Sequence, residues 1–357
     1  MTLSGHTSEV FVVAWNPRSS VLASGSGDST ARLWAVPAAA AAAGGAAAVA
    51  AASPLLLKHY DAGEGAGLND VTTLEWNARG SMLATGSYDG CARIWSEAGV
   101  LQRVLKAHRG PLFSIKWNKP GNYLLSGSVD RTTVVWDATS GVPVKQFGFH
   151  AAPTIDVDWR DDVSFASCST DKMIYVCALG SDTPVRTFEG HKDEINAIKW
   201  DPSGTLLASC SDDFTAKVWS VESPDPLLNL WEHSKEIYTC RWSPAVRSKL
   251  LLATASFDST VKLWDVTGGR CATTLAGHAD PVYSVAWSPN GEYLASGSFD
   301  RAVIVWDVKT GKKVRTFRGH GGVFELSWNA RGDRLAACFS NNAVVVMDTR
   351  MWAPLTY

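Results

Sequence analysis

The chain has 357 residues, 46% of them hydrophobic, and a formal net charge of −2. The near-neutral charge gives no basic surface of the kind that nucleic-acid-binding domains carry. No apolar run is long enough for a membrane span, and Met1 is not followed by the charged and apolar regions of a signal peptide. Seven cysteines without a Cys-x-x-Cys pair or a zinc-like Cys/His spacing indicate free thiols in a reducing compartment and no metal site.

Repeating units of about 40–45 residues run through the whole chain. Each unit is opened by one of the eight histidines, which are His6, His59, His108, His150, His191, His233, His278 and His320. In six units a tryptophan follows nine residues later, and in six units a second tryptophan follows six residues after a turn aspartate. This pattern is typical of WD-repeat β-propellers, in which each unit forms a four-stranded blade. The sequence therefore predicts an all-β, eight-bladed propeller that occupies residues 1–357 as a single domain.

The first strand in chain order is the short segment Thr2-Leu3, which precedes Gly5-His6. The eighth unit ends after its third strand, Ala343–Met347, so Thr2-Leu3 is expected to complete the last blade by overlap. With so few residues available, this seam is expected to be the weakest joint of the ring.

Two insertions follow in the first two units. The alanine-rich tract Pro37–Ser53 lacks charges, caps and an amphipathic stripe, so it is expected to form a flexible loop within blade 1 rather than a short helix. The glycine-containing segment Asp61–Asn69 is expected to form a mobile loop on the opposite rim.

A hydroxyl residue stands four residues before most of the turn aspartates. Together with the histidine and the second tryptophan, it predicts a buried chain of hydrogen bonds from indole through hydroxyl and imidazole to carboxylate. Each bond of such a network contributes about 0.5–1.5 kcal/mol. We assign this network to the following residues of five units: His6, Ser24, Asp28 and Trp34; His108, Ser126, Asp130 and Trp136; His191, Ser209, Asp213 and Trp219; His233, Thr254, Asp258 and Trp264; His278, Ser296, Asp300 and Trp306.

Serine, histidine and aspartate also form the catalytic triad of many hydrolases. Nucleophilic catalysis needs one exposed serine with an oxyanion hole, whereas this set recurs in most blades. We therefore interpret it as structural, and the sequence predicts no enzyme activity and no cofactor. Unit four has Cys177 at the second tryptophan position, and unit eight has lost hydroxyl, aspartate and tryptophan together, with Ala337, Asn341 and Met347 in their places.

Three positions of each unit are predicted to surround the mouth of the propeller, on the rim that carries the histidine and the aspartate. They are the residue that starts the inner strand, the residue two before it, and the residue directly before the turn aspartate. Aromatic and acidic residues are frequent there, and lysine and arginine do not occur. The aromatic residues are Phe11, Tyr88, Phe113, Tyr238, Phe257, Tyr283, Phe299 and Phe324, and the acidic ones are Glu9, Asp70, Asp156, Glu194, Asp212 and Glu236.

Two interpretations of this rim are open. The aromatic residues either fill the channel as a plug or form a mouth for a basic, extended peptide, held by carboxylates outside and by aromatic faces within. We favour the peptide-binding mouth.

The residues between the landmarks resemble those of the transducin beta-like proteins, WD-repeat subunits of nuclear co-repressor complexes. The matching stretches include SEVFVVAWNP, LASGSGDSTARLW and PVYSVAWSPNGEYLASGSFD. The cysteine in place of the second tryptophan of unit four, Cys177, also resembles a trait of that family. The resemblance implies a nuclear scaffold that works with a co-repressor and a histone deacetylase, contacts histone tails and can recruit ubiquitin machinery. It implies protein partners rather than nucleic acid, a membrane or a small-molecule substrate. Members of that family carry an N-terminal dimerisation segment that engages the co-repressor, and because this sequence starts at its first repeat, that contact and the oligomeric state stay open.

A substrate receptor of a cullin–RING ubiquitin ligase is the alternative function. Such receptors carry a Trp-Asp-x-Lys/Arg ending, which occurs here as Trp306–Lys309 and, in degenerate form, as Met347–Arg350. This ending is common in propellers, so it favours the alternative only weakly. A G-protein β subunit fits less well, because it has seven blades and an N-terminal coiled coil.

Overall fold

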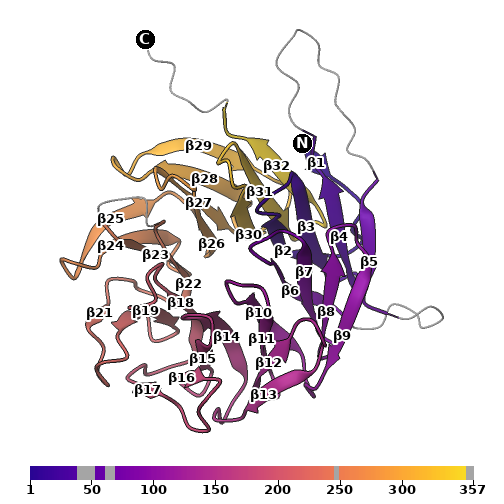
Figure 1. Ribbon diagram of the computed structural model, residues 1–357. Helices are drawn as coiled ribbons and strands as arrows, with labels where there is room; N and C mark the ends of the chain where they lie inside the picture. The colour runs from indigo at the N-terminus through magenta and orange to yellow at the C-terminus, as the bar shows by residue number, and fades with distance from the viewer. Residues whose placement is uncertain (38–52, 61–68, 245–248, 351–357) are drawn as a thin grey trace.

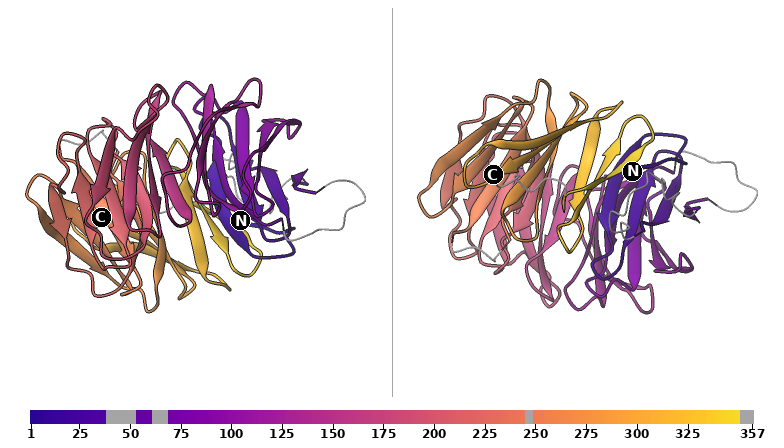
Figure 2. Two further views of the ribbon diagram at one scale, coloured as in Figure 1. Left: turned by 90° about the horizontal axis from the view of Figure 1, so that it is seen from below. Right: turned by 90° about the horizontal axis from the view of Figure 1, so that it is seen from above.

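The computed structural model describes residues 1–37, 53–60, 69–244 and 249–350, which form eight four-stranded antiparallel sheets. Figure 1 shows the sheets as blades arranged in a ring around a central axis, and the edge-on views in Figure 2 show them side by side in one layer. The predicted all-β, eight-bladed propeller is therefore confirmed. Residues 38–52 and 61–68, to which the two loop predictions apply, lie outside the described residues.

In blades 1 to 7 the four strands follow one another along the chain from the central axis outward (Figure 1). Blade 1 contains β2 (Val10–Trp15), β3 (Val21–Ser26), β4 (Thr30–Ala35) and β5 (Leu55–Lys58); blade 2 contains β6 (Val71–Trp76), β7 (Met82–Ser87), β8 (Cys91–Ser96) and β9 (Leu101–Lys106). Blade 3 contains β10 (Leu112–Trp117), β11 (Tyr123–Ser128), β12 (Thr133–Asp137) and β13 (Pro143–Phe147); blade 4 contains β14 (Thr154–Trp159), β15 (Ser164–Ser169), β16 (Met173–Ala178) and β17 (Arg186–Glu189). Blade 5 contains β18 (Ile195–Trp200), β19 (Leu207–Ser211), β20 (Ala216–Trp219) and β21 (Leu228–Leu230); blade 6 contains β22 (Ile237–Trp242), β23 (Leu251–Ser256), β24 (Thr260–Asp265) and β25 (Arg270–Ala276). Blade 7 contains β26 (Val282–Trp287), β27 (Tyr293–Ser298), β28 (Ala302–Asp307) and β29 (Lys313–Arg318); blade 8 contains β30 (Val323–Trp328), β31 (Arg334–Phe339), β32 (Val344–Asp348) and β1 (Thr2–Leu3).

The middle strands of the blades are largely apolar on both faces because each blade packs between two neighbours. In β3, the successive residues Leu22 and Ala23 are both fully buried. Leu22 packs with Cys338 of blade 8, and Ala23 packs with Val71 of blade 2. The hydrophobic core therefore consists of the interfaces between adjacent blades rather than of one central cluster.

The ring closes by overlap of the two ends of the chain, as predicted. Strand β1 pairs with β32 in antiparallel register, with Leu3 opposite Val344. The backbone N–H of Val346 donates to the carbonyl of Met1 at 2.8 Å, and the terminal amine of Met1 donates to the carbonyl of Val346 at 2.9 Å. Leu3 is only 2% exposed, so its side chain fills the place that a fourth strand fills in the other blades.

A β-bulge interrupts the inner strand of every blade just after its first residue. In blade 6, for example, the pairing register shifts between Ile237 and Thr239, so that Tyr238 is the bulged residue. A bulge re-aims the side chains on either side of it. Two successive residues of each inner strand therefore line the central channel, as Tyr238 and Thr239 do in blade 6.

The tryptophan that ends each inner strand joins its blade to the preceding one. In seven of the eight blades the indole N–H donates to the carbonyl of the residue before the corresponding tryptophan of the preceding blade. The bond from Trp242 to the carbonyl of Lys199 measures 2.8 Å. Trp200 in blade 5 is the exception, because its buried indole nitrogen has no hydrogen-bond partner among the described residues.

Candidate functional site

Five blades contain the complete hydrogen-bond network of indole, hydroxyl, imidazole and carboxylate. In blade 5, Trp219 Nε1 donates to Ser209 Oγ at 2.8 Å, and Ser209 Oγ lies 2.7 Å from His191 Nε2. His191 Nδ1 lies 2.8 Å from Asp213 Oδ2. An indole N–H can only donate, so the serine accepts it, gives its own proton to Nε2 and leaves the ring proton on Nδ1, facing the carboxylate.

The ionisation of this network follows from burial and from these bonds. Burial lowers the pKa of His191, even though Asp213 opposes the shift, so the imidazole is neutral. In blade 1, burial alone would raise the pKa of Asp28, but hydrogen bonds from His6 and Thr30 outweigh it and lower this pKa to about 2. The network therefore pairs a neutral imidazole with a charged carboxylate.

The remaining blades depart from this arrangement in three different ways. In blade 2 the guanidinium of Arg93 stands between imidazole and carboxylate, at 3.1 Å from His59 Nδ1 and 2.7 Å from Asp89 Oδ2, which the sequence pattern did not predict. Blade 4 keeps its imidazole–carboxylate bond at 2.9 Å and buries Cys177 in place of the indole. In blade 8 His320 is exposed, in keeping with the loss of its partners.

These serines and threonines are not placed for nucleophilic catalysis. Ser209 and its counterpart Ser296 are fully buried, and each hydroxyl already accepts an indole N–H. A nucleophile must reach the substrate, so we assign the network a structural role.

The rim of the channel carries a continuous row of aromatic rings, which we call the aromatic arc. It runs over blades 6, 7, 8 and 1 and consists of Tyr238, Phe257, Tyr283, Phe299, Phe324 and Phe11. Ring centroids are 5.0 Å apart for Tyr238 and Tyr283, 6.2 Å for Tyr283 and Phe324, and 5.7 Å for Phe324 and Phe11. The structure thus brings six of the eight predicted aromatic residues together. The other two, Tyr88 and Phe113, form a separate pair on blades 2 and 3 with centroids 6.4 Å apart.

A backbone hydrogen bond that recurs in every blade fixes the outer part of the rim. The N–H of the residue before the turn aspartate donates to the carbonyl of the residue two before the bulge, as from Asp212 to Glu194 and from Phe257 to Glu236, both at 2.9 Å. Two of the three predicted rim positions are therefore neighbours within each blade. Glu194 is exposed and Glu236 is half-buried.

The remaining predicted acids of the rim differ in exposure. Glu9 is exposed, and Asp70 and Asp212 are half-buried. Burial raises the pKa of the Asp70 carboxyl. Asp212 accepts a hydrogen bond of 2.7 Å from the side-chain amide of Asn196.

The prediction that Asp156 lies on the rim is wrong. The bulge in β14 makes Ile155 the bulged residue of blade 4 and places Asp156 deeper, against the channel. There its carboxylate accepts a hydrogen bond from Ser114 Oγ at 2.8 Å and pairs with Lys199 Nζ at 2.6 Å.

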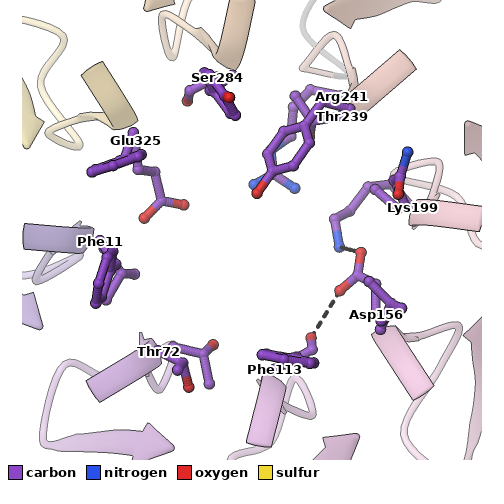
Figure 3. Close-up of a pocket in the computed structure, with 18 of the residues that line it drawn as sticks. Phe11, Thr72, Phe113, Asp156, Lys199, Thr239, Arg241, Ser284 and Glu325 are labelled. Carbon is purple, nitrogen blue, oxygen red and sulfur yellow. Dashed lines mark hydrogen bonds and ion pairs between the residues drawn. The ribbon is translucent and has the colours of Figure 1, made fainter. Parts of the chain in front are cut away.

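The channel beneath the rim is a cavity of about 410 Å³ to which all eight inner strands contribute (Figure 3). Charged residues line its wall, although the three predicted rim positions of each blade carry no lysine or arginine. Three of them, Lys116, Lys199 and Arg241, directly precede the tryptophan that ends their inner strand. Glu75 and Asp158 hold the same position in blades 2 and 4, and they line a neighbouring pocket together with Lys116. Glu325 and Asp156 stand two residues earlier in their strands. The repeat landmarks did not predict these charged residues. A signal was present, because five of the eight residues that directly precede a first tryptophan are charged.

Three of these charged residues, Lys116, Lys199 and Asp156, form ion pairs. Lys116 Nζ lies 3.1 Å from Glu75, whose second oxygen accepts the backbone N–H of Trp117 at 2.6 Å. Burial would lower the pKa of Lys116, but the charge of Glu75 outweighs it and raises that pKa. Burial raises the pKa of Glu325, and the charge of Arg241 opposes this shift only in part.

Metal clusters and membrane-spanning helices do not occur among the described residues. Within the four described ranges, no three His, Cys, Asp or Glu side chains are grouped so that they could hold a metal ion. In the same part of the chain, no helix has the length and apolar character needed to cross a membrane.

The architecture and the repeats agree with a family model described as "WD domain, G-beta repeat", which matches residues 1–35, 63–96, 99–137, 182–220, 224–265, 269–307 and 311–348. The chain belongs to this WD-repeat family. The unmatched interval 138–181 contains most of blade 4, whose second tryptophan is replaced by Cys177.

Sequence comparisons show which members of the WD-repeat family this chain resembles. The WD40 repeat-containing protein HOS15 of Arabidopsis thaliana is 54% identical over 98% of this chain, and the human F-box-like/WD repeat-containing protein TBL1X is 54% identical over 57% of it. These similarities confirm the resemblance to the transducin beta-like proteins. The crystal structure of the C-terminal WD40 domain of Sif2 superimposes with a TM-score of 0.83, at 26% identity and 98% coverage of both chains. The chain spans 58% of the length of HOS15 and 35% of that of TBL1X.

Proposed function

We propose that this WD-repeat protein is a non-enzymatic scaffold of a nuclear co-repressor complex that contains a histone deacetylase. We further propose that the mouth of its propeller binds basic peptides such as histone tails. The similarity to the transducin beta-like proteins supports the first part. The aromatic arc and the acidic residues of the rim support the second.

The observation that carries the peptide-binding proposal is the continuity of the aromatic arc. Tyr238 is 43% exposed and Phe299 is 51% exposed, so these rings offer their faces to a ligand instead of being sealed in a core. A lysine or arginine over an aromatic face gains about 0.5–2 kcal/mol, depending on desolvation. The carboxylates of Glu194 and Glu236 lie on the outer side of the same rim and add attraction for a cationic chain.

Synthetic peptides that represent the core histone tails test this proposal when they are titrated against purified protein. Tyr283→Ala should lower the affinity for the tail peptide several-fold and leave the melting temperature nearly unchanged. Glu236→Lys should lower it further at low salt, with a smaller effect at physiological ionic strength, where the Debye length is about 8 Å. Trp231→Ala is the matched control, because Trp231 is 72% exposed and directly follows the outermost strand of blade 5, away from the mouth.

The opposite result identifies the arc as a plug of the channel. In that case Tyr283→Ala lowers the melting temperature, and binding per folded molecule does not change. Measuring affinity and melting temperature on the same variants therefore decides between the two interpretations.

The alternative, a substrate receptor of a cullin–RING ligase, has its own readout. The protein is used as bait in an affinity pull-down from nuclear extract. Co-repressor and deacetylase subunits among the partners support the proposed function, whereas a cullin adaptor in their place supports the alternative.

A further inference from the structure

Two charged side chains of the channel wall have unused hydrogen-bonding groups. Glu325 Oε2 accepts the backbone N–H of Val13 at 3.0 Å, while Oε1 has no partner among the described residues. The guanidinium of Arg241 donates to no acceptor within the described ranges. Figure 3 shows both side chains pointing toward the open centre of the channel from different sides. By contrast, Asp156 is already paired with Lys199 in the same cavity.

We propose that the channel below the aromatic arc receives one long basic side chain, a lysine or an arginine, and that Glu325 is its carboxylate partner. This inference rests on the proposed function, because the inserted side chain belongs to the basic peptide bound at the mouth.

The path from the rim to Glu325 favours a cation at each step. The three rim positions of each blade include carboxylates and no lysine or arginine. The next layer consists of ring faces, and Phe324, the bulged residue directly before Glu325, stands between Phe11 and Tyr283 in the arc. Ring faces attract cations and do not attract anions. At the end of this path, the free oxygen of Glu325 is an acceptor for an ammonium or a guanidinium group.

Arg241 limits the channel to a single inserted charge. Its guanidinium is positively charged and near enough to Glu325 to oppose the effect of burial, which raises the pKa of that carboxyl. A cation that passed beyond Glu325 would meet Arg241 and the ammonium group of Lys116. The inserted side chain therefore ends at Glu325, and Arg241 acts as a positioning residue that sets this depth.

Small probes test the channel independently of any histone sequence. N-acetyl-lysine amide and N-acetyl-arginine amide are titrated against the protein by saturation-transfer NMR, with N-acetyl-norleucine amide as the uncharged probe of similar length. Glu325→Gln should weaken binding of the two cationic probes about tenfold or more and leave the norleucine probe unaffected. Glutamine keeps an oxygen that accepts the N–H of Val13, so the melting temperature should not change. Glu97→Gln, an exposed site on the outer side of blade 2, is the matched control and should have no effect.

Arg241→Met provides a second variant with the opposite sign. Removal of the competing positive charge should strengthen binding of the cationic probes by about two- to fivefold. Cation binding that is unaffected by Glu325→Gln overturns the inference, as does the absence of saturable cation binding to the unaltered chain. It is also overturned if N-acetyl-aspartate amide binds and loses its affinity in Arg241→Met, because the channel is then an anion site.

The failure of this inference is distinguishable from the failure of the proposed function. A histone-tail peptide that needs Tyr283 but is unaffected by Glu325→Gln binds at the arc without entering the channel, so the proposed function stands alone. A tail peptide that depends on neither residue contradicts both.

Discussion

Blades 5 and 8 have the same strand order and nearly the same register, yet they are held by different sets of bonds. Blade 5 contains the complete network around His191 and forms all four strands from consecutive residues. Blade 8 lacks the network and takes its fourth strand, β1, from the other end of the chain. The bonds between blades show the reverse. The indole of Trp328 donates to blade 7 at 3.0 Å, whereas the indole of Trp200 in blade 5 has no partner among the described residues.

The difference shows that a blade of this ring needs either its own network or strong bonds to its neighbours, and not necessarily both. In stacked repeats the stability of a unit includes the interfaces on either side of it. Blade 8 gains a further bond to blade 1, because the carboxylate of Glu325 accepts the backbone N–H of Val13. Blade 5 is compensated in the same way by Asp158 of blade 4, whose carboxylate accepts the backbone N–H of Trp200 at 2.7 Å. Variants that remove one kind of bond should therefore affect the two blades unequally.

The largest effect is expected at the seam of blade 8. Deletion of Met1–Ser4 removes β1 and leaves β32 as an unpaired edge. Burial of Leu3 alone contributes about 1.5–3 kcal/mol, and each lost backbone hydrogen bond adds about 0.5–1.5 kcal/mol. Thermal or chemical denaturation should therefore show a loss of about 2–5 kcal/mol, accompanied by association in size-exclusion chromatography. A monomer with an unchanged melting temperature would show that the ring closes without this overlap.

A smaller loss of stability is expected when the hydrogen-bond network of blade 5 is broken, and blade 8 serves as the comparison. The carboxylate of Asp213 accepts four hydrogen bonds, from His191 Nδ1, from the backbone N–H of Lys192 and from the N–H and hydroxyl of Thr215. Asp213→Ala should cost about 1–3 kcal/mol, because these donors are left without an acceptor. Asn341 holds the corresponding position in blade 8 and is exposed, so Asn341→Ala should change stability by less than about 0.5 kcal/mol. Equal losses at both sites in urea denaturation would contradict a stabilising network in blade 5.

The fold and the network were predictable because they repeat. A residue type that returns at the same place in most units, such as His191 or Trp219, identifies a shared geometry without any knowledge of contacts. Even the loss of the network was predictable, since Asn341 and Met347 of unit eight depart from their counterparts together. The short segment Thr2-Leu3 was identified by the same comparison between units.

The channel was not predictable in the same way, because each blade contributes a different residue to it. Strict alternation along a strand would place neighbouring residues on opposite faces. The bulge breaks this alternation, so Ile155 and Asp156 both line the channel and Asp156 was assigned to the wrong layer. The insertion of Arg93 between His59 and Asp89 was missed for a related reason, since no other unit uses an arginine in this way.

The smallest effect concerns the indole bonds between blades and compares Trp15 with Trp200. The two side chains are equally buried, at 6% and 7% exposed, so replacement by phenylalanine removes a similar volume from each. The indole of Trp15 donates to the carbonyl of Ser327 in blade 8 at 3.1 Å, whereas the indole nitrogen of Trp200 has no acceptor among the described residues. Trp15→Phe should therefore cost about 0.5–1.5 kcal/mol more than Trp200→Phe, because only the first variant loses a hydrogen bond and leaves a carbonyl unpaired. The difference between the two variants in urea denaturation is the quantity to measure, since the shared loss of packing cancels in it. Equal losses would mean that the indole bonds contribute nothing beyond packing.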